Sequence, residues 1–226
     1  MYWDSTIIIL IPAIIFSLIA QLMVKSTFSK YSNERNSRDL TGADAARAIL
    51  DRNGLTHVRI ERISGSLTDH FDPRANVIRL SDDVYGSATV AAVGVAAHEA
   101  GHAVQYATGY APIKVRNAII PITRFGSSLS TPLVILGLAF SWDFLITAGI
   151  LLFCAVVLFQ AITLPVEFDA SGRAIKSLRS AHILEDDELN NAKKVLTAAA
   201  MTYVAAMVTA LLSLVRLLLI SGRRRR

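Results

Sequence analysis

Long apolar runs dominate the pattern of this chain and are separated by polar segments. Four runs stand out: Thr6–Val24, Ile119–Phe140, Phe144–Leu164 and Val195–Ile220. The first holds about 19 residues without a charge, enough helix to cross a hydrocarbon layer of roughly 30 Å. It has no basic segment before it and no small-residue cleavage site, so we expect a retained anchor. The second contains Arg124, Pro121 and Pro132, so we expect an irregular or interfacial beginning.

The polar segment after the first run predicts a small mixed domain. Residues 25–37 indicate a juxtamembrane linker, and Thr41–Asp44 has capping-box spacing that begins an alanine-rich helix ending at Asn53-Gly54. Alternation at residues 57–61 and 76–80 predicts two short strands. Between them, residues 65–73 have the composition of a turn, and Ser81–Asp83 is expected to cap a short helical turn.

An apolar helix is predicted from about Ser87 to Tyr106, and it contains most of the candidate metal-binding and catalytic residues. His98 and His102 are four residues apart, so both imidazoles lie on one face, where they can bind one metal ion together. Glu99 is offset around the helix, beside the metal, and can take a proton from a water there. A chance pair of surface histidines would predict a polar helix, but residues 88–97 carry no charge. The pattern therefore favours a zinc site.

A catalytic zinc ion needs a third protein ligand and one open position. Glu167 follows the third apolar run directly, and two crossings separate it from His102, which returns the chain to the same face. Asp143 is expected on the opposite face, and residues 185–188 are interpreted as a solvated helix turn. His57 is expected on a strand surface and His70 in a turn, so Glu167 is the preferred third ligand.

Composition supports a membrane protein and argues against nucleic acid as a partner. The hydrophobic content is 53%, and the mean hydropathy of +0.45 is too high for an ordinary soluble fold. The net charge is +5, but the basic residues flank apolar runs without interleaved aromatics, as membrane topology predicts. The single cysteine, Cys154, excludes an intramolecular disulfide and is expected to pack as a small apolar residue.

The motifs carry a family resemblance. His98–His102 with Glu167–Ala170 resembles gluzincins of the HtpX and CAAX-prenyl-protease types, and the whole chain is similar to the bacterial YugP-type membrane zinc peptidases. The second likeness rests on residues 53–55, 67–74, 80–81, 84–85, 96–105 and 164–171. It implies Zn²⁺ held by His98, His102 and Glu167, with Glu99 as the catalytic base. Ser171 stands where the HtpX pattern has an aspartate, and Asp169 is a possible substitute for orienting the histidines.

Together these observations predict a mainly α, multi-pass membrane protein: a zincin-like domain with a small β-sheet on a bundle of about four transmembrane helices. The expected parts are an anchor at 1–24, the peptidase domain at 25–117, a transmembrane hairpin at 118–164, the third-ligand helix and linker at 165–194, and a C-terminal helix with a basic tail at 195–226. Eleven basic residues near span ends on the motif's side, against the four of Arg223–Arg226, predict an active site facing the cytoplasm from the bacterial inner membrane.

The predicted function is that of a membrane-bound zinc endopeptidase acting on membrane or misfolded polypeptides. Arg173 and His182 are candidate donors to the oxyanion. Two alternatives are an intramembrane protease, for which the uncharged stretch before His98 is short, and a non-catalytic scaffold, which would need a fourth ligand. The strand at Asn76–Leu80 is either an open edge that binds substrate or an ordinary strand paired on both sides.

Overall fold

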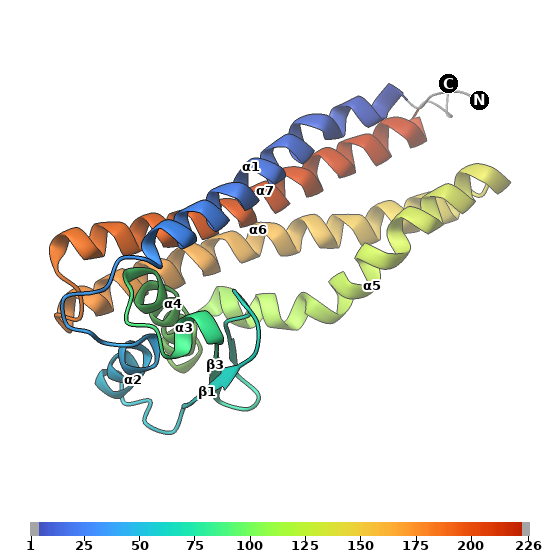
Figure 1. Ribbon diagram of the computed structural model, residues 1–226. Helices are drawn as coiled ribbons and strands as arrows, with labels where there is room; N and C mark the ends of the chain where they lie inside the picture. Colours follow the sequence, from blue (N-terminus) through green and yellow to red (C-terminus); the bar gives the residue numbers. More distant parts are fainter. Residues whose placement is uncertain (1–4, 223–226) are drawn as a thin grey trace. The chain divides into compact units, whose positions relative to one another are not determined.

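The computed structural model describes residues 5–222 of a mainly helical protein (Figure 1). The tail Arg223–Arg226 lies outside the described residues. The elements, in chain order, are η1 (Ser5–Leu10), α1 (Ile11–Tyr31), α2 (Gly42–Arg52), β1 (Arg59–Ile63), β2 (His70–Asp72), β3 (Val77–Ser81), α3 (Asp82–Tyr85), α4 (Val90–Ala107), α5 (Ala111–Phe140), α6 (Asp143–Ser180) and α7 (Asp186–Gly222).

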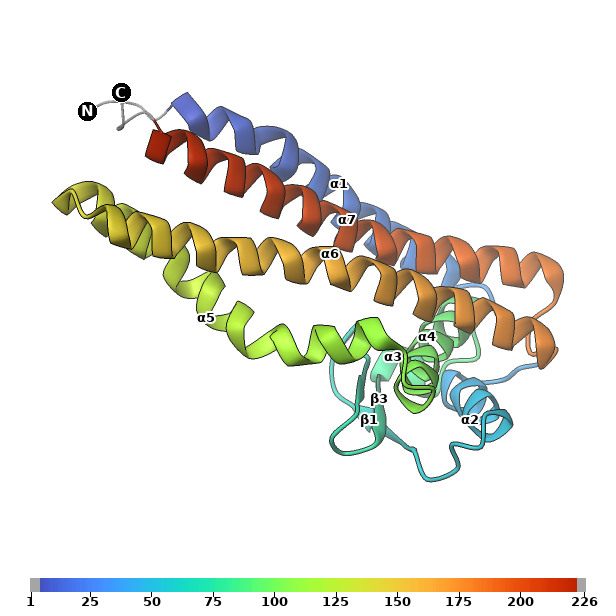
Figure 2. The same ribbon diagram turned by 180° about the vertical axis from the view of Figure 1, so that it is seen from behind.

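Within residues 5–222, four helical segments are long and apolar enough to cross a membrane, as the sequence predicted. They are Thr6–Tyr31, Ala111–Phe140, Asp143–Ser180 and Asp186–Gly222. Each extends beyond its apolar run. Helix α1 continues to Tyr31 because Phe28 and Tyr31 are buried in a hydrophobic core, so the expected linker is partly helical. Helix α5 is helical from Ala111, which corrects the expected irregular beginning; its two prolines lie inside a helix that Figure 2 shows to be bent.

The chain divides into two compact units. The first comprises Met1–Gln21, Lys114–Pro165 and Thr202–Arg226, and the second comprises Leu22–Ile113 and Val166–Met201. In the first unit, the Ser17 and Thr209 hydroxyls lie 3.3 Å apart and join α1 to α7, which run side by side in Figures 1 and 2. Many large apolar side chains on these helices, isoleucines, leucines and phenylalanines among them, are exposed, as a lipid-facing surface requires.

The second unit contains a three-stranded sheet in the order β1-β3-β2. Strand β1 pairs with β3 in parallel and β2 pairs with β3 in antiparallel orientation, so β3 is the central strand. The two predicted strands are confirmed with small shifts of their ends. The alternative that residues 76–80 form an open edge is wrong. Strand β2 was missed because its three residues lie in a segment rich in turn formers, where the Asp72 carboxylate accepts hydrogen bonds from the N–H groups of Arg74 and Ala75.

Small residues let the helices of the second unit approach closely around α4. Ala92, Ala96 and Ala100 are fully buried, and a Cβ added at Gly94 would touch Ala192 of α7. Helix α2 begins with the predicted capping box, in which the Thr41 hydroxyl accepts from the Asp44 N–H and the Asp44 carboxylate accepts from the Thr41 N–H. The result is a closely packed core around α4.

Candidate metal centre

Helix α4 places two imidazoles on one face. It spans Val90–Ala107, close to the predicted limits, and the Thr89 hydroxyl caps it by accepting from the N–H of Ala92. The ring centroids of His98 and His102 lie 4.7 Å apart, and the rings are nearly perpendicular. The spacing within this one helix is therefore enough to place the two side chains next to each other.

Helix α6 brings a carboxylate to this histidine pair. The Nε2 atoms of His98 and His102 lie 3.3 Å and 3.5 Å from the same oxygen, Oε2 of Glu167. Each of the three residues offers one ligand atom, and these atoms all lie within 4.8 Å of one another. Glu167 is 3% exposed and His102 is 9% exposed, so the group is held inside the protein.

The donor set fits a zinc ion. Zinc binds His nitrogen at about 2.0–2.1 Å and carboxylate oxygen at about 2.0–2.2 Å, so two neighbouring ligands of a tetrahedral ion lie about 3.3 Å apart. The two nitrogen–oxygen distances at Glu167 match that edge length. A buried carboxylate facing two imidazole nitrogens is also the arrangement in which a divalent cation offsets the cost of burying charge. Within residues 5–222 this is the only group of three or more such side chains close enough to hold a metal.

Both imidazoles are held from behind through their second ring nitrogen. Nδ1 of His98 lies 3.1 Å from Oγ of Ser171, and Nδ1 of His102 lies 3.0 Å from Oε1 of Gln105. When Nδ1 carries the proton and donates it to these oxygens, the Nε2 lone pair faces Glu167, which is the tautomer that a metal ligand requires. The position that departs from the HtpX pattern, Ser171, is thus in direct contact with the first histidine.

Gln105 is fully buried and joins α4 to α6. Its Nε2 donates to the carbonyl of Val166 at 2.8 Å and to Oδ2 of Asp169 at 2.8 Å, while its Oε1 faces His102. Asp169 therefore reaches the imidazole through Gln105 and does not touch either histidine directly. Gln105 was not among the predicted site residues. The available signal was a polar side chain on the apolar helix, three residues after His102 and hence near its face.

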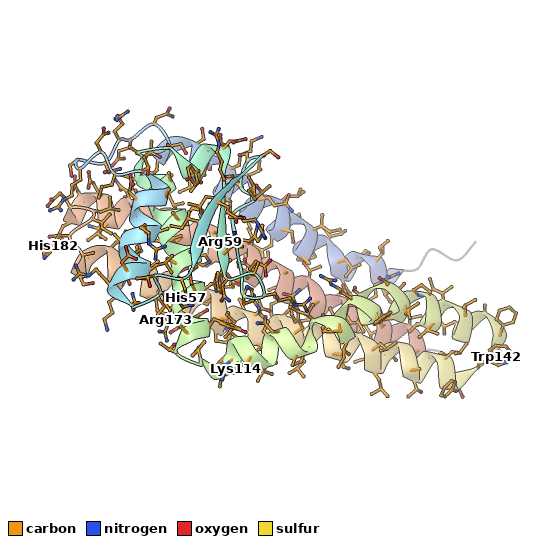
Figure 3. The ribbon with its side chains drawn as sticks, turned by 90° about the horizontal axis from the view of Figure 1, so that it is seen from below. His57, Arg59, Lys114, Trp142, Arg173 and His182 are labelled. Atoms are coloured by element: carbon orange, nitrogen blue, oxygen red, sulfur yellow. The ribbon has the colours of Figure 1, made fainter. Side chains whose placement is uncertain are left out.

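Arg173 and His182, the two candidate oxyanion donors, are placed differently from one another. The Arg173 Nε donates to Oδ2 of Asp169 at 2.5 Å, and its guanidinium lies over the Tyr110 ring at 5.6 Å from the centroid. His182 lies in the turn after α6, with a positive φ of 51°, and is exposed. Figure 3 shows the two labelled side chains well apart within the same unit. Arg173 thus supports the hydrogen-bond chain behind His102.

The histidine and acidic residues that were not chosen as the third ligand lie in other parts of the structure. His70 is on β2, where its Nδ1 lies 2.9 Å from the Thr68 carbonyl, and Asp143 begins α6. The interpretation of residues 185–188 as a solvated turn is wrong for Glu188, which is 6% exposed and accepts from the N–H groups of Ser37 and Glu185. This carboxylate caps α7 and ties it to the segment after α1, which explains its burial.

Glu99 lies one residue beyond His98 on α4 and is 8% exposed. Within the part of the chain that the structure describes, its carboxylate forms no hydrogen bond or ion pair. Glu99 is therefore a buried carboxylate next to His98 in the chain that is not committed to a structural partner among the described residues.

Comparisons with known proteins agree with this geometry. Residues 6–222 match the model of a protein family described as "Putative neutral zinc metallopeptidase". The chain is 45% identical over 214 residues to "Putative membrane protease YugP" of Bacillus subtilis (strain 168), and the match covers 95% of each chain. No solved structure matches the chain significantly.

Proposed function

The chain belongs to this family of zinc metallopeptidases, and on that premise we propose that it is a membrane-bound endopeptidase whose zinc ion is held by His98, His102 and Glu167. The observation that carries the proposal is the convergence of both Nε2 atoms on one carboxylate oxygen at 3.3 Å and 3.5 Å. Three protein ligands leave one tetrahedral position open, which is the arrangement of catalytic zinc sites. A structural scaffold would need a fourth protein ligand.

A zinc ion held by these three residues would supply Lewis-acid chemistry, polarising the peptide carbonyl and lowering the pKa of water towards neutral pH. Glu99 is the general base in this proposal. It accepts a proton from the attacking water and then donates that proton to the nitrogen of the leaving amine. Its burial and lack of a structural partner support this role. Ser171 and Gln105 hold the two imidazoles in the required tautomer, so neither ring has to reorient during the reaction.

Extended polypeptide substrate is proposed to bind along the outer edge of β2. This strand is an edge of the sheet, because β3 pairs with both β1 and β2. It also contacts the zinc helix: the Phe71 and Tyr106 rings meet edge-on, with centroids 6.1 Å apart. An unpaired strand edge offers backbone donors and acceptors that any extended peptide can use. Broad sequence tolerance, as cleavage of misfolded or membrane polypeptides demands, is consistent with this arrangement.

The proposed active site faces the cytoplasm. The support is the distribution of basic residues, because the positive-inside rule places the loops that contain most of them on that side. The short connection between α5 and α6 contains Ser141 and Trp142 and no basic residue. Four candidate membrane-crossing helices are compatible with this arrangement.

The function is tested by replacing Glu99 with Gln in the purified full-length protein. We expect proteolysis of an unfolded model substrate to be abolished while bound zinc stays near one ion per chain, because the side chain moves protons and is not a ligand. Glu167→Ala is the matched comparison and should lose both zinc and activity. If Glu99→Gln lost its zinc, or kept its activity, the assigned role would be wrong.

A further inference from the structure

A basic groove lies between the end of α1 and the beginning of α7, within the second unit and apart from the zinc ligands. It has a volume of about 720 Å³ and is lined by residues of these two helices only. Three of its lining residues are lysines: Lys30 comes from α1, and Lys193 and Lys194 come from α7. No carboxylate is among the residues that line it. The chain has six lysines in total, so half of them gather at one groove.

The ammonium groups are brought together around one aromatic ring. The Nζ of Lys30 lies 5.2 Å, and the Nζ of Lys194 lies 5.8 Å, from the centroid of the buried Tyr31 ring. The Lys194 ammonium also donates to Oδ1 of Asn191 at 3.0 Å. Within residues 5–222, the side chains of Lys30 and Lys193 form no ion pair. Like charges held close together repel one another, and a bound anion would relieve that repulsion.

The nearest acidic residue in the chain after Lys30, Glu34, is already engaged. Its carboxylate accepts a hydrogen bond from the Asn191 side-chain amide at 2.9 Å, and Glu34 does not line the groove. The residues that line the groove therefore supply no carboxylate to balance the three lysines, which makes the groove complementary to an anion.

Polarity changes along the groove in one direction. Helix α1 lines it from Met23 to Tyr31, a rise of about 12 Å, and α7 lines it from Asn190 to Ala198 in the opposite sense. Apolar Met23 and Ala198 therefore lie at the end where both helices continue into their apolar runs, and the lysines lie at the other end. The hydroxyls of Thr27 and Thr197 line the middle. An amphiphile with a charged head and an apolar tail has the same order of polarity.

We propose that this groove binds the phosphate group of an anionic lipid, with the lysines around the headgroup and the start of an acyl chain along Met23 and Ala198. Basic pockets between membrane helices at the bilayer surface have the right charge and depth for such headgroups. The Lys30 ammonium lies over the Tyr31 ring at the polar end of the groove, and long basic side chains place their charge in this way at membrane interfaces. The site is independent of the zinc centre, and its binding requires no catalytic step.

The proposal is tested on the full-length protein in micelles that contain equal amounts of phosphatidylglycerol and phosphatidylcholine with identical acyl chains. Native mass spectrometry counts the lipid molecules that stay bound. We expect the unaltered protein to retain phosphatidylglycerol selectively. The triple variant Lys30→Gln, Lys193→Gln, Lys194→Gln should bind it about 100-fold more weakly, since each lysine contributes roughly a fivefold change. Replacement of the same three lysines by arginine should preserve binding.

The matched control removes the other three lysines: Lys25→Gln, Lys114→Gln, Lys176→Gln. Its net charge equals that of the groove variant, and we expect it to retain the lipid. Equal losses in both variants would mean diffuse attraction and would overturn the groove as a site. A separate titration with inorganic phosphate, in micelles of phosphatidylcholine alone, distinguishes the source of the phosphate. If free phosphate bound as tightly as the lipid, the lipid assignment would be overturned. Helix content by circular dichroism and zinc per chain check that each variant is folded.

Discussion

Replacement of Ser171 by alanine isolates a single contact behind the zinc site. The change removes one oxygen atom, and within the described chain that Oγ atom has one partner, Nδ1 of His98 at 3.1 Å. The side chain of His98 is 14% exposed, so a water molecule can partly replace the lost acceptor. Loss of one such hydrogen bond costs about 1 kcal/mol, with a range of roughly 0.5–1.5. Removal of a group that orients a metal-binding histidine weakens metal affinity by about 10 to 100-fold.

A tenfold loss of zinc affinity corresponds to about 1.4 kcal/mol, which lies within the range for one lost hydrogen bond. We therefore expect zinc to bind about tenfold more weakly in Ser171→Ala, at the lower end of the 10 to 100-fold range. The assay is competition for zinc between the purified protein and a chelator of known affinity. Ser177→Ala is the matched control, because Ser177 lies on the same helix but contacts neither histidine. The melting temperature of the zinc-free protein should be the same for both variants. Unchanged zinc affinity in Ser171→Ala, or an equal loss in Ser177→Ala, would refute the role of Ser171.

Three further outcomes are expected. Gln105→Leu should weaken zinc binding more than Ser171→Ala, towards 100-fold in the same competition assay, because Gln105 is fully buried and water cannot easily replace it; an effect smaller than that of Ser171→Ala would contradict this. Proline is placed in turn at the three positions of β2. At one of them, Phe71 or a neighbour whose N–H faces outward, KM should rise while zinc content and melting temperature stay unchanged. If KM were unchanged at all three positions, this edge would be excluded as the substrate site. In a Cys154→Ser background, an impermeant thiol reagent should label a cysteine at Ser141 from outside intact cells but not one at Ser66, and the reverse result would invert the proposed topology.

The features that could be predicted from the sequence depend on local patterns. The capping box at Thr41, the helix around His98 and the four apolar segments each follow from spacing within a single stretch, and each is present in the structure. Glu167 could be selected by counting membrane crossings. These predictions needed no knowledge of which distant surfaces meet.

The features that could not be predicted depend on contacts between distant segments. Strand β2 consists of only three residues, and its own composition indicates a turn. It is a strand because it pairs with β3, which local composition does not reveal. The burial of Glu188 depends on Ser37, which is 151 residues away. The role of Gln105 depends on Val166 and Asp169, which no local pattern connects with it.

The spacing of the zinc motif accounts for only half of the site, because the third ligand arrives on another helix whose distance from α4 must also be fixed. Gly101 sets that distance. A Cβ added there would lie 2.6 Å from the carbonyl oxygen of Ala170, so the absence of a side chain lets α6 approach at the one turn that lies between Glu167 and Ser171. The same close crossing brings the Glu167 carboxylate and the Ser171 hydroxyl to opposite sides of the His98 ring. A glycine between the two histidines therefore determines both a candidate zinc ligand and the group that orients His98, although it contributes no ligand atom itself.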